Sequence, residues 1–101
     1  MMLPVFLHIE ATPNPDEEEA LQAYLSKAPK VIQAHGGVSI ATYDVEKALD
    51  DTNHPAVFIV VSFPTRDAID NLFTDEAYKA LIPQRDKGFS HLRFYVTSER
   101  I

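Results

Sequence analysis

The sequence predicts an α+β fold, in which a four-stranded antiparallel sheet carries helices on one face. Residues 3–11 and 90–97 alternate between apolar and polar side chains, as half-buried strands do. Residues 56–63 form an apolar, β-branched and aromatic run that only Ser62 interrupts, which is typical of a strand covered on both faces. Between these strands, apolar residues recur at spacings of three and four, as in amphipathic helices.

Length and composition limit the class of protein. At 101 residues with 46% hydrophobic composition, we expect a single folded domain over residues 1–101. The chain has no cysteine, begins without a basic segment and contains no apolar stretch of membrane-spanning length, so we expect a cytoplasmic protein with no membrane partner. A net charge of −6 with scattered Lys and Arg disfavours nucleic acid as a partner.

The first half of the chain predicts strand, helix and strand. After the strand at 3–11, Asn14 is a suitable N-cap for a helix with Pro15 at its first position. Pro29 should kink the helix or make it restart, and Gly36-Gly37 should end it. Its predicted buried stripe is Leu21, Tyr24, Leu25 and Ala28, continuing through Ile32 to His35. A strand follows at 38–43.

The second half repeats the pattern. Residues 44–54 are polar and acidic and predict a loop or a single helical turn before the central strand at 56–63. Thr65 should cap a helix, and a second helical piece should begin at Thr74 or Asp75, weaken at Pro83 and end at Gly88. The last strand is expected at 90–97. This β-α-β-β-α-β order is that of the ferredoxin-like α+β sandwich.

Strand periodicity predicts a polar cluster on the sheet face turned away from the helices. In ferredoxin-like order the first strand lies between the third and the fourth, so His8 could lie near Ser62 on one side and near Arg93 or Tyr95 on the other. In a ligand pocket, His8 could act as a base or donor and Arg93 could hold an anion. Alternatively, these groups satisfy one another between two copies of the chain. The candidate pocket residues are His8, Tyr43, Ser62, Arg93 and Tyr95.

His35 and Arg85 are weaker candidates. His35 continues the helical stripe and could line a cleft, or it could interact as a cation with the helix dipole. Arg85 could clamp a carboxylate, cap helix carbonyls or pair with an acid. The four histidines show no spacing typical of metal ligands, and no phosphate-binding glycine loop or nucleophile elbow is present, so we expect neither a metal nor a cofactor.

Several segments together resemble a known family. They are Gly36-Gly37, Phe63-Pro64-Thr65 and the run from Thr74 to Leu81 followed by Arg85. Over nearly its whole length the chain resembles the domain-of-unknown-function family 1330, of the dimeric α+β barrel superfamily. This resemblance implies that two sheets pack face to face in a homodimer and that a small organic ligand could bind. The family usually has an acid where this chain has Ser62.

Two functions are compatible with these patterns. In the first, the protein is a binding or structural homodimer, paired through its sheet faces, with no chemistry of its own. In the second, it is a cofactor-independent enzyme, similar to a monooxygenase or isomerase, that acts on a small hydrophobic or aromatic acid. The absence of any catalytic motif favours the first, and the polar cluster around His8 favours the second. A cavity reached by His8 or Arg93 would support the enzyme.

Overall fold

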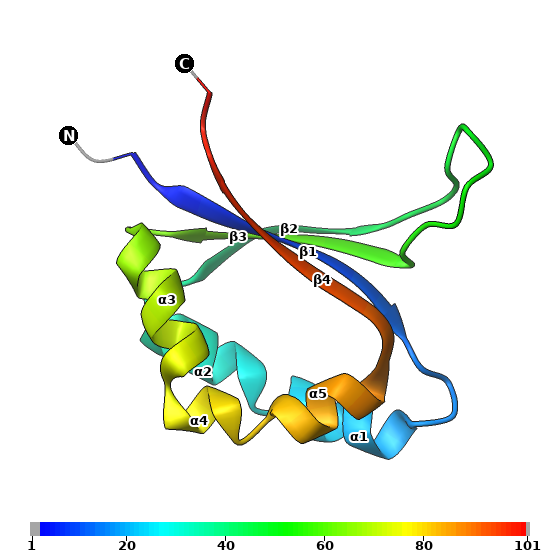
Figure 1. Cartoon of the computed structure of the whole chain (residues 1–101), viewed down its shortest axis with the longest axis horizontal. Helices are drawn as coiled ribbons and strands as arrows, with labels where there is room; N and C mark the ends of the chain where they lie inside the picture. Colours follow the sequence, from blue (N-terminus) through cyan, green and yellow to red (C-terminus); the bar gives the residue numbers. More distant parts are fainter. Residues whose placement is uncertain (1–2, 101) are drawn as a thin grey trace.

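A computed structural model of the chain describes residues 3–100 and shows the predicted α+β architecture. The strands are β1 (Val5–Pro13), β2 (Val38–Asp44), β3 (Val57–Phe63) and β4 (Phe89–Ser98). The helices are α1 (Glu18–Leu25), α2 (Ala28–Ala34), α3 (Arg66–Thr74), α4 (Glu76–Lys79) and α5 (Ile82–Gly88). All these helices lie on one side of the sheet, so the fold has two layers (Figure 1). The strand ends differ from the predicted ones by no more than two residues.

The sheet is antiparallel, and its strand order is β2-β3-β1-β4, as in a ferredoxin-like fold. β1 therefore lies between β3 and β4, as predicted. His8 is paired with Val60 of β3 and with Tyr95 of β4. Since side chains alternate across a strand, this register decides which residues share a face.

One face of the sheet packs on the helices and forms the core. Val61 and Phe63 of β3 point to this face and are buried, whereas Val60 and Ser62 point the other way and are partly exposed. The buried cluster comprises Leu7, Ile9, Ala11, Tyr24, Ala28, Val61, Phe63, Ile69, Leu72, Tyr78 and Leu81. No helix formed by residues 3–100 lies on the other face, which we call the open face (Figure 1).

Prolines and caps divide the helical layer as the sequence predicted. α1 ends at Leu25, and the chain restarts as α2 with Pro29 in its first turn. Gly36 follows α2 with φ of +85°, and the Gly37 N–H donates to the Ile32 carbonyl, so the two glycines close the helix. The Thr65 hydroxyl accepts from the Ala68 N–H at the start of α3.

The start of α1 was predicted wrongly. The helix begins at Glu18, not directly after Asn14. The Asn14 side chain instead accepts from the Asp16 N–H, and the Asn14 N–H donates to the Gly88 carbonyl. Asn14 thus makes a local turn that ties the end of β1 to the end of α5, because its short amide can serve turns as well as caps.

Two further expectations are resolved by the structure. Residues 45–56 form a loop without a helical turn, and it projects beyond the sheet (Figure 1). Leu49, which lies in this loop, is 89% exposed, so the segment adds no apolar side chain to the core at this position. Leu25 was predicted to be buried with Leu21 and Tyr24 but is 45% exposed, because α1 ends there and α2 leaves in a new direction.

Candidate functional site

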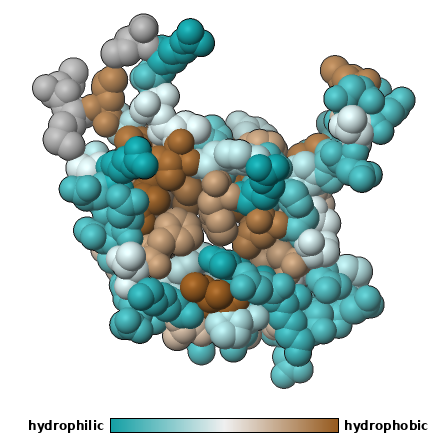
Figure 2. Space-filling view, viewed as in Figure 1, coloured by the Kyte–Doolittle hydropathy of each residue, from teal (hydrophilic) through white to brown (hydrophobic). Residues whose placement is uncertain are grey.

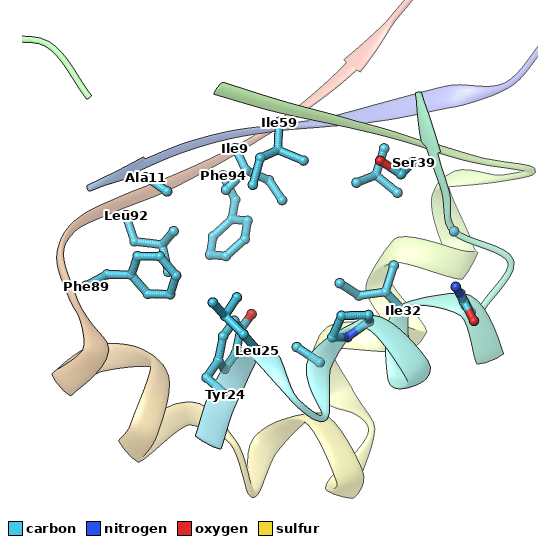
Figure 3. A pocket seen from close by; sticks show the side chains of 15 residues that line it. Ile9, Ala11, Tyr24, Leu25, Ile32, Ser39, Ile59, Phe89, Leu92 and Phe94 are labelled. Atoms are coloured by element: carbon cyan, nitrogen blue, oxygen red, sulfur yellow. The ribbon is translucent and has the colours of Figure 1, made fainter. Parts of the chain in front are cut away.

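An apolar cavity of about 210 Å³ lies between the helices and the sheet. We call it the interlayer cavity. Every strand of the sheet contributes to its wall, and α1 and α2 form the opposite side (Figure 3). Its lining residues are Ile9, Ala11, Tyr24, Leu25, Ala28, Pro29, Ile32, Gln33, Gly37, Ser39, Ile59, Val61, Phe89, Leu92 and Phe94.

The lining follows from strand alternation and from small side chains. Ile9 and Ala11 of β1 face the helices in register with Phe94 and Leu92 of β4. Ala11 and Ala28 face the space from opposite layers and fill little of it, because each carries only a methyl group. The cavity is therefore apolar on nearly all sides, with polar groups confined to a few positions.

The rim of the cavity is formed by residues that remain in contact with solvent. Leu25, at the end of α1, is half exposed, and Gln33 and Ser39 are exposed. Ser39 is paired with Val61 and faces the helices, and the shift of register after Ser39 turns Ala41 to the opposite face. Leu25, which was wrongly predicted to be buried, is thus an apolar side chain at the mouth of the cavity.

Tyr24 connects the cavity to a buried polar chain. Its hydroxyl lies 2.9 Å from the hydroxyl of Tyr78 on α4, and Nη1 of Arg85 on α5 donates to the Tyr78 hydroxyl at 3.3 Å. Burial first of all, and then the neighbouring Tyr78, raises the pKa of the Tyr24 hydroxyl above its ordinary value. Tyr24 therefore stays protonated at neutral pH and can donate a hydrogen bond.

Arg85 is held behind this pair rather than in the cavity. Its guanidinium carbon lies 5.8 Å from the ring centre of Tyr78 and 5.7 Å from that of Phe94, and its Nε contacts Asp86 at 3.1 Å. Burial by itself lowers the pKa of Arg85, but the hydrogen bond to the Tyr78 hydroxyl and the contact with Asp86 outweigh burial and raise it. Of the alternatives considered for Arg85, pairing with an acid is observed, with Asp86.

The residues predicted to form a polar cluster lie on the open face, as the register requires. Tyr95 is directly opposite His8, but Ser62 is opposite Phe6 and Arg93 is opposite Glu10. Phe6 and Glu10 are four residues apart on β1, so Ser62 and Arg93 are separated by about 13 Å along the strand direction. Tyr43 is paired with Phe58, on the far side of β3 from β1.

Contacts on the open face are few. Arg93 lies over the ring of Tyr95, with 5.2 Å from its guanidinium carbon to the ring centre. His91 approaches the Glu10 carboxylate at 3.4 Å. The side chains of His8, Tyr43 and Ser62 form no hydrogen bond with another of residues 3–100. The structure therefore brings His8 next to Tyr95 and Arg93 next to Tyr95, but it does not gather all five.

None of the predicted candidates lines the interlayer cavity, neither the five on the open face nor His35 and Arg85. Arg85 is linked to the cavity indirectly, because it hydrogen-bonds to Tyr78, whose hydroxyl bonds to that of the lining residue Tyr24. Tyr24 was predicted as part of a buried helical stripe, and no sequence pattern indicated that its hydroxyl pairs with that of Tyr78. A signal that could have indicated the cavity is the small size of Ala28 in the predicted buried stripe and of Ala11, which strand alternation puts on the same face as Leu7 and Ile9.

His35 lies at the end of α2 and binds Asp75, the N-cap residue of α4. Its Nε2 is 2.7 Å from Oδ2 of Asp75, and the other Asp75 oxygen accepts from the Ala77 N–H and so caps α4. Two hydrogen bonds lower the pKa of the Asp75 carboxyl: the larger effect comes from His35 and the smaller from the Ala77 N–H. The pair therefore joins the end of the cavity-lining helix α2 to the start of α4.

We predict that Asp75→Asn lowers the melting temperature by a few degrees at pH 7. Because the pKa of Asp75 is lowered in the folded state, its charge stabilises the fold at any pH above the ordinary pKa of about 3.9. This stabilisation is lost as the pH falls through the lower pKa of the folded state. The difference between wild type and variant should accordingly shrink below pH 4. Thermal melts between pH 3 and pH 7 measure it, with the exposed Asp70→Asn as control. A constant difference would contradict the prediction.

Comparison with known proteins assigns the chain to a family. The sequence model described as "Domain of unknown function (DUF1330)" matches residues 8–97, which is most of the chain. The chain belongs to the DUF1330 family. The family has no established function, in agreement with the expectation from sequence. No curated protein matches this DUF1330 chain.

Solved structures share the fold of this DUF1330 protein. A protein of unknown function from Rhodopseudomonas palustris is 17% identical with a TM-score of 0.81, over 100% of this chain and 85% of that one. A dimeric ferredoxin-like protein of unknown function from Thermobifida fusca YX is 14% identical with a TM-score of 0.64, over 98% and 93% of the two chains. A conserved protein from Methanosarcina mazei Go1 is 11% identical with a TM-score of 0.64, over 98% and 95%. At these identities the matches show the ferredoxin-like fold.

Over residues 3–100 of the DUF1330 chain, no helix is long and apolar enough to cross a membrane. In the same range, no group of three or more His, Cys, Asp or Glu side chains is placed to hold a metal ion.

Proposed function

We propose that this DUF1330 protein is a homodimeric, single-domain binding protein that takes a small apolar molecule into the interlayer cavity. The observation that carries the proposal is the cavity itself, about 210 Å³ of space with a nearly continuous apolar lining. Cavities of this kind are costly to leave empty in a folded core, since their walls lose packing contacts. A ligand that fills the space would recover those contacts.

The volume limits the size of the ligand. An apolar cavity of about 150 Å³ is large enough to hold benzene. A space of about 210 Å³ therefore suits a substituted single ring or a short branched chain. The half-exposed Leu25 gives such a molecule an apolar path from solvent to the interior.

The open face supports pairing of two copies. This face carries Phe6, Phe58, Val60 and Tyr95, and no helix of the described part of the chain covers it (Figure 1). Tyr43 and Val38, also on this face, are each 59% exposed. A second copy that packs on this face would remove the apolar area from water. Contiguous exposed apolar patches are typical of such protein interfaces. The proposed dimer is therefore formed by the two open faces.

The interlayer cavity supports the enzyme alternative less well. A general acid or base must reach its substrate, but the cavity lining holds no His, Asp, Glu, Lys or Arg. His8 and Arg93 lie on the opposite face of the sheet from the cavity. An enzyme would therefore have to use a site between two open faces rather than the interlayer cavity.

The proposal is tested with α-methylstyrene, an apolar ring compound of suitable size. We expect saturable binding with a dissociation constant below about 1 mM, given the range of affinities open to ligands of this size. Intermolecular NOEs should join the ligand to methyl groups of Ile9, Ile32 and Ile59. Ala28→Leu should fill the cavity and abolish binding.

The control for the cavity-filling variant is Ala34→Leu, the same change at an exposed position of the same helix. Ala34→Leu should bind α-methylstyrene as the wild type does. If Ala28→Leu does not fold by circular dichroism, Ile59→Phe replaces it as the filling variant. Absence of saturable binding to the wild type, or NOEs to Phe58 and Val60 on the open face, would show that the proposal is wrong.

A further inference from the structure

The polar chain behind the cavity holds one more donor hydrogen than it uses. Arg85 donates to the Tyr78 hydroxyl, and the hydroxyls of Tyr78 and Tyr24 lie 2.9 Å apart in a single hydrogen bond. Two hydroxyls carry two hydrogens, and this bond uses one of them. Within residues 3–100 no further acceptor contacts either hydroxyl. One hydroxyl hydrogen thus remains without a protein acceptor, in a buried position.

The geometry indicates which hydroxyl holds the free hydrogen. The guanidinium of Arg85 donates to the Tyr78 oxygen, which polarises that hydroxyl and makes it the better donor of the two. Tyr78 therefore donates to Tyr24, and the hydrogen of Tyr24 is left over. Of the three hydrogen-bonded residues, Tyr24 lines the cavity, whereas Tyr78 and Arg85 do not.

We propose that the ligand of the interlayer cavity presents an acceptor oxygen to the Tyr24 hydroxyl. This inference rests on the proposed function and names the ligand class: a small apolar body with one carbonyl-type oxygen. Figure 3 shows the Tyr24 side chain rising from α1 toward the sheet, below Phe94. An apolar site with one well-placed polar group is the usual way in which a pocket fixes the orientation of its ligand.

Charge supports the same ligand class. The positive guanidinium of Arg85 lies behind Tyr78 and favours partial negative charge on the cavity side of the tyrosines. The raised pKa of Tyr24 keeps its proton in place, so the group is a donor at neutral pH. A ligand without an acceptor would leave this buried hydrogen unpaired, which is unfavourable.

The test compares acetophenone with α-methylstyrene, in which a methylene group replaces the carbonyl oxygen at nearly the same shape. Dissociation constants of both are measured for wild type and for Tyr24→Phe by titration followed by NMR. Tyr24→Phe removes the hydrogen bond to acetophenone and leaves α-methylstyrene without a lost contact. Relative to α-methylstyrene, acetophenone should therefore bind the variant about tenfold more weakly than it binds the wild type. In the wild type, the carbonyl resonance of ¹³C-labelled acetophenone should also move downfield on binding.

Tyr43→Phe is the matched control, because it removes a tyrosine hydroxyl on the open face, on the other side of the sheet from the cavity, and should leave the ratio unchanged. Tyr78→Phe should change the ratio less than Tyr24→Phe does, since Tyr24 keeps its own hydrogen. If the wild type binds both compounds but Tyr24→Phe leaves the ratio within twofold, this inference is wrong and the proposed function stands. If Tyr24→Phe does not fold, an unshifted carbonyl resonance in the wild type overturns the inference. If the wild type binds neither compound, both fail.

Discussion

Gly88→Ala is expected to destabilise the fold by about 3 kcal/mol, near the upper end of what overpacking usually costs. A Cβ atom at Gly88 would lie 2.8 Å from Cα and 2.9 Å from the backbone nitrogen of Leu21. Backbone atoms cannot move aside as a flexible side chain can, so α1 would have to separate from α5. For a domain of this size, the melting temperature should fall by about 15 °C.

The same substitution should also disturb the cavity, because α1 carries Tyr24 and Leu25. α-Methylstyrene binding to the folded variant should weaken accordingly. Lys87→Ala is the control, since it removes only an exposed side chain whose contact with Glu17 is 3.6 Å long. Thermal melts and titrations of both variants decide the prediction. A Gly88→Ala protein as stable as the wild type would mean that α1 and α5 are not packed as closely as the structure shows.

Val60→Lys is expected to convert the proposed dimer into a monomer or to unfold it. Val60 is in the middle of the open face, paired with His8 on β1 and Ala41 on β2. A lysine there would place an unpaired charge between two sheets, which costs several kcal/mol unless the sheets separate. Sedimentation velocity at low micromolar concentration should show the wild type as a dimer and the variant at half its mass.

Gln22→Lys is the matched control, because Gln22 is exposed on α1, on the helical side of the molecule. It should leave both mass and melting temperature unchanged. A wild type that sediments as a stable monomer at this concentration would show that the open face is not the dimer interface. Figure 2 shows a second apolar surface, in the middle of the face between the sheet and the helices, with polar side chains around it. Because Val60 lies on the open face, Val60→Lys tests the open face and not this second surface.

The elements of this protein are encoded locally. Alternation over residues 3–11 and 90–97 predicted β1 and β4, and the Thr65 and Gly36-Gly37 caps predicted where helices begin and end. These signals need only neighbouring residues, since capping and strand periodicity act over a few positions. Asn14 shows the limit even of local signals, because caps and turns use the same side chain and the contact with Gly88 decided between them.

The sheet face of the predicted cluster residues followed from sequence, but the site did not. Alternation placed His8, Ser62, Arg93 and Tyr95 on the open face correctly, yet the register separates Ser62 from Arg93. The interlayer cavity depends on how far the helices stand from the sheet, which no periodicity specifies. The hydroxyl pair of Tyr24 and Tyr78 joins residues 54 positions apart. Sequence alone thus determined the elements, their order and their apolar faces, because these depend on short-range chemistry. Only tertiary packing decided where space was left and which polar groups meet beside it.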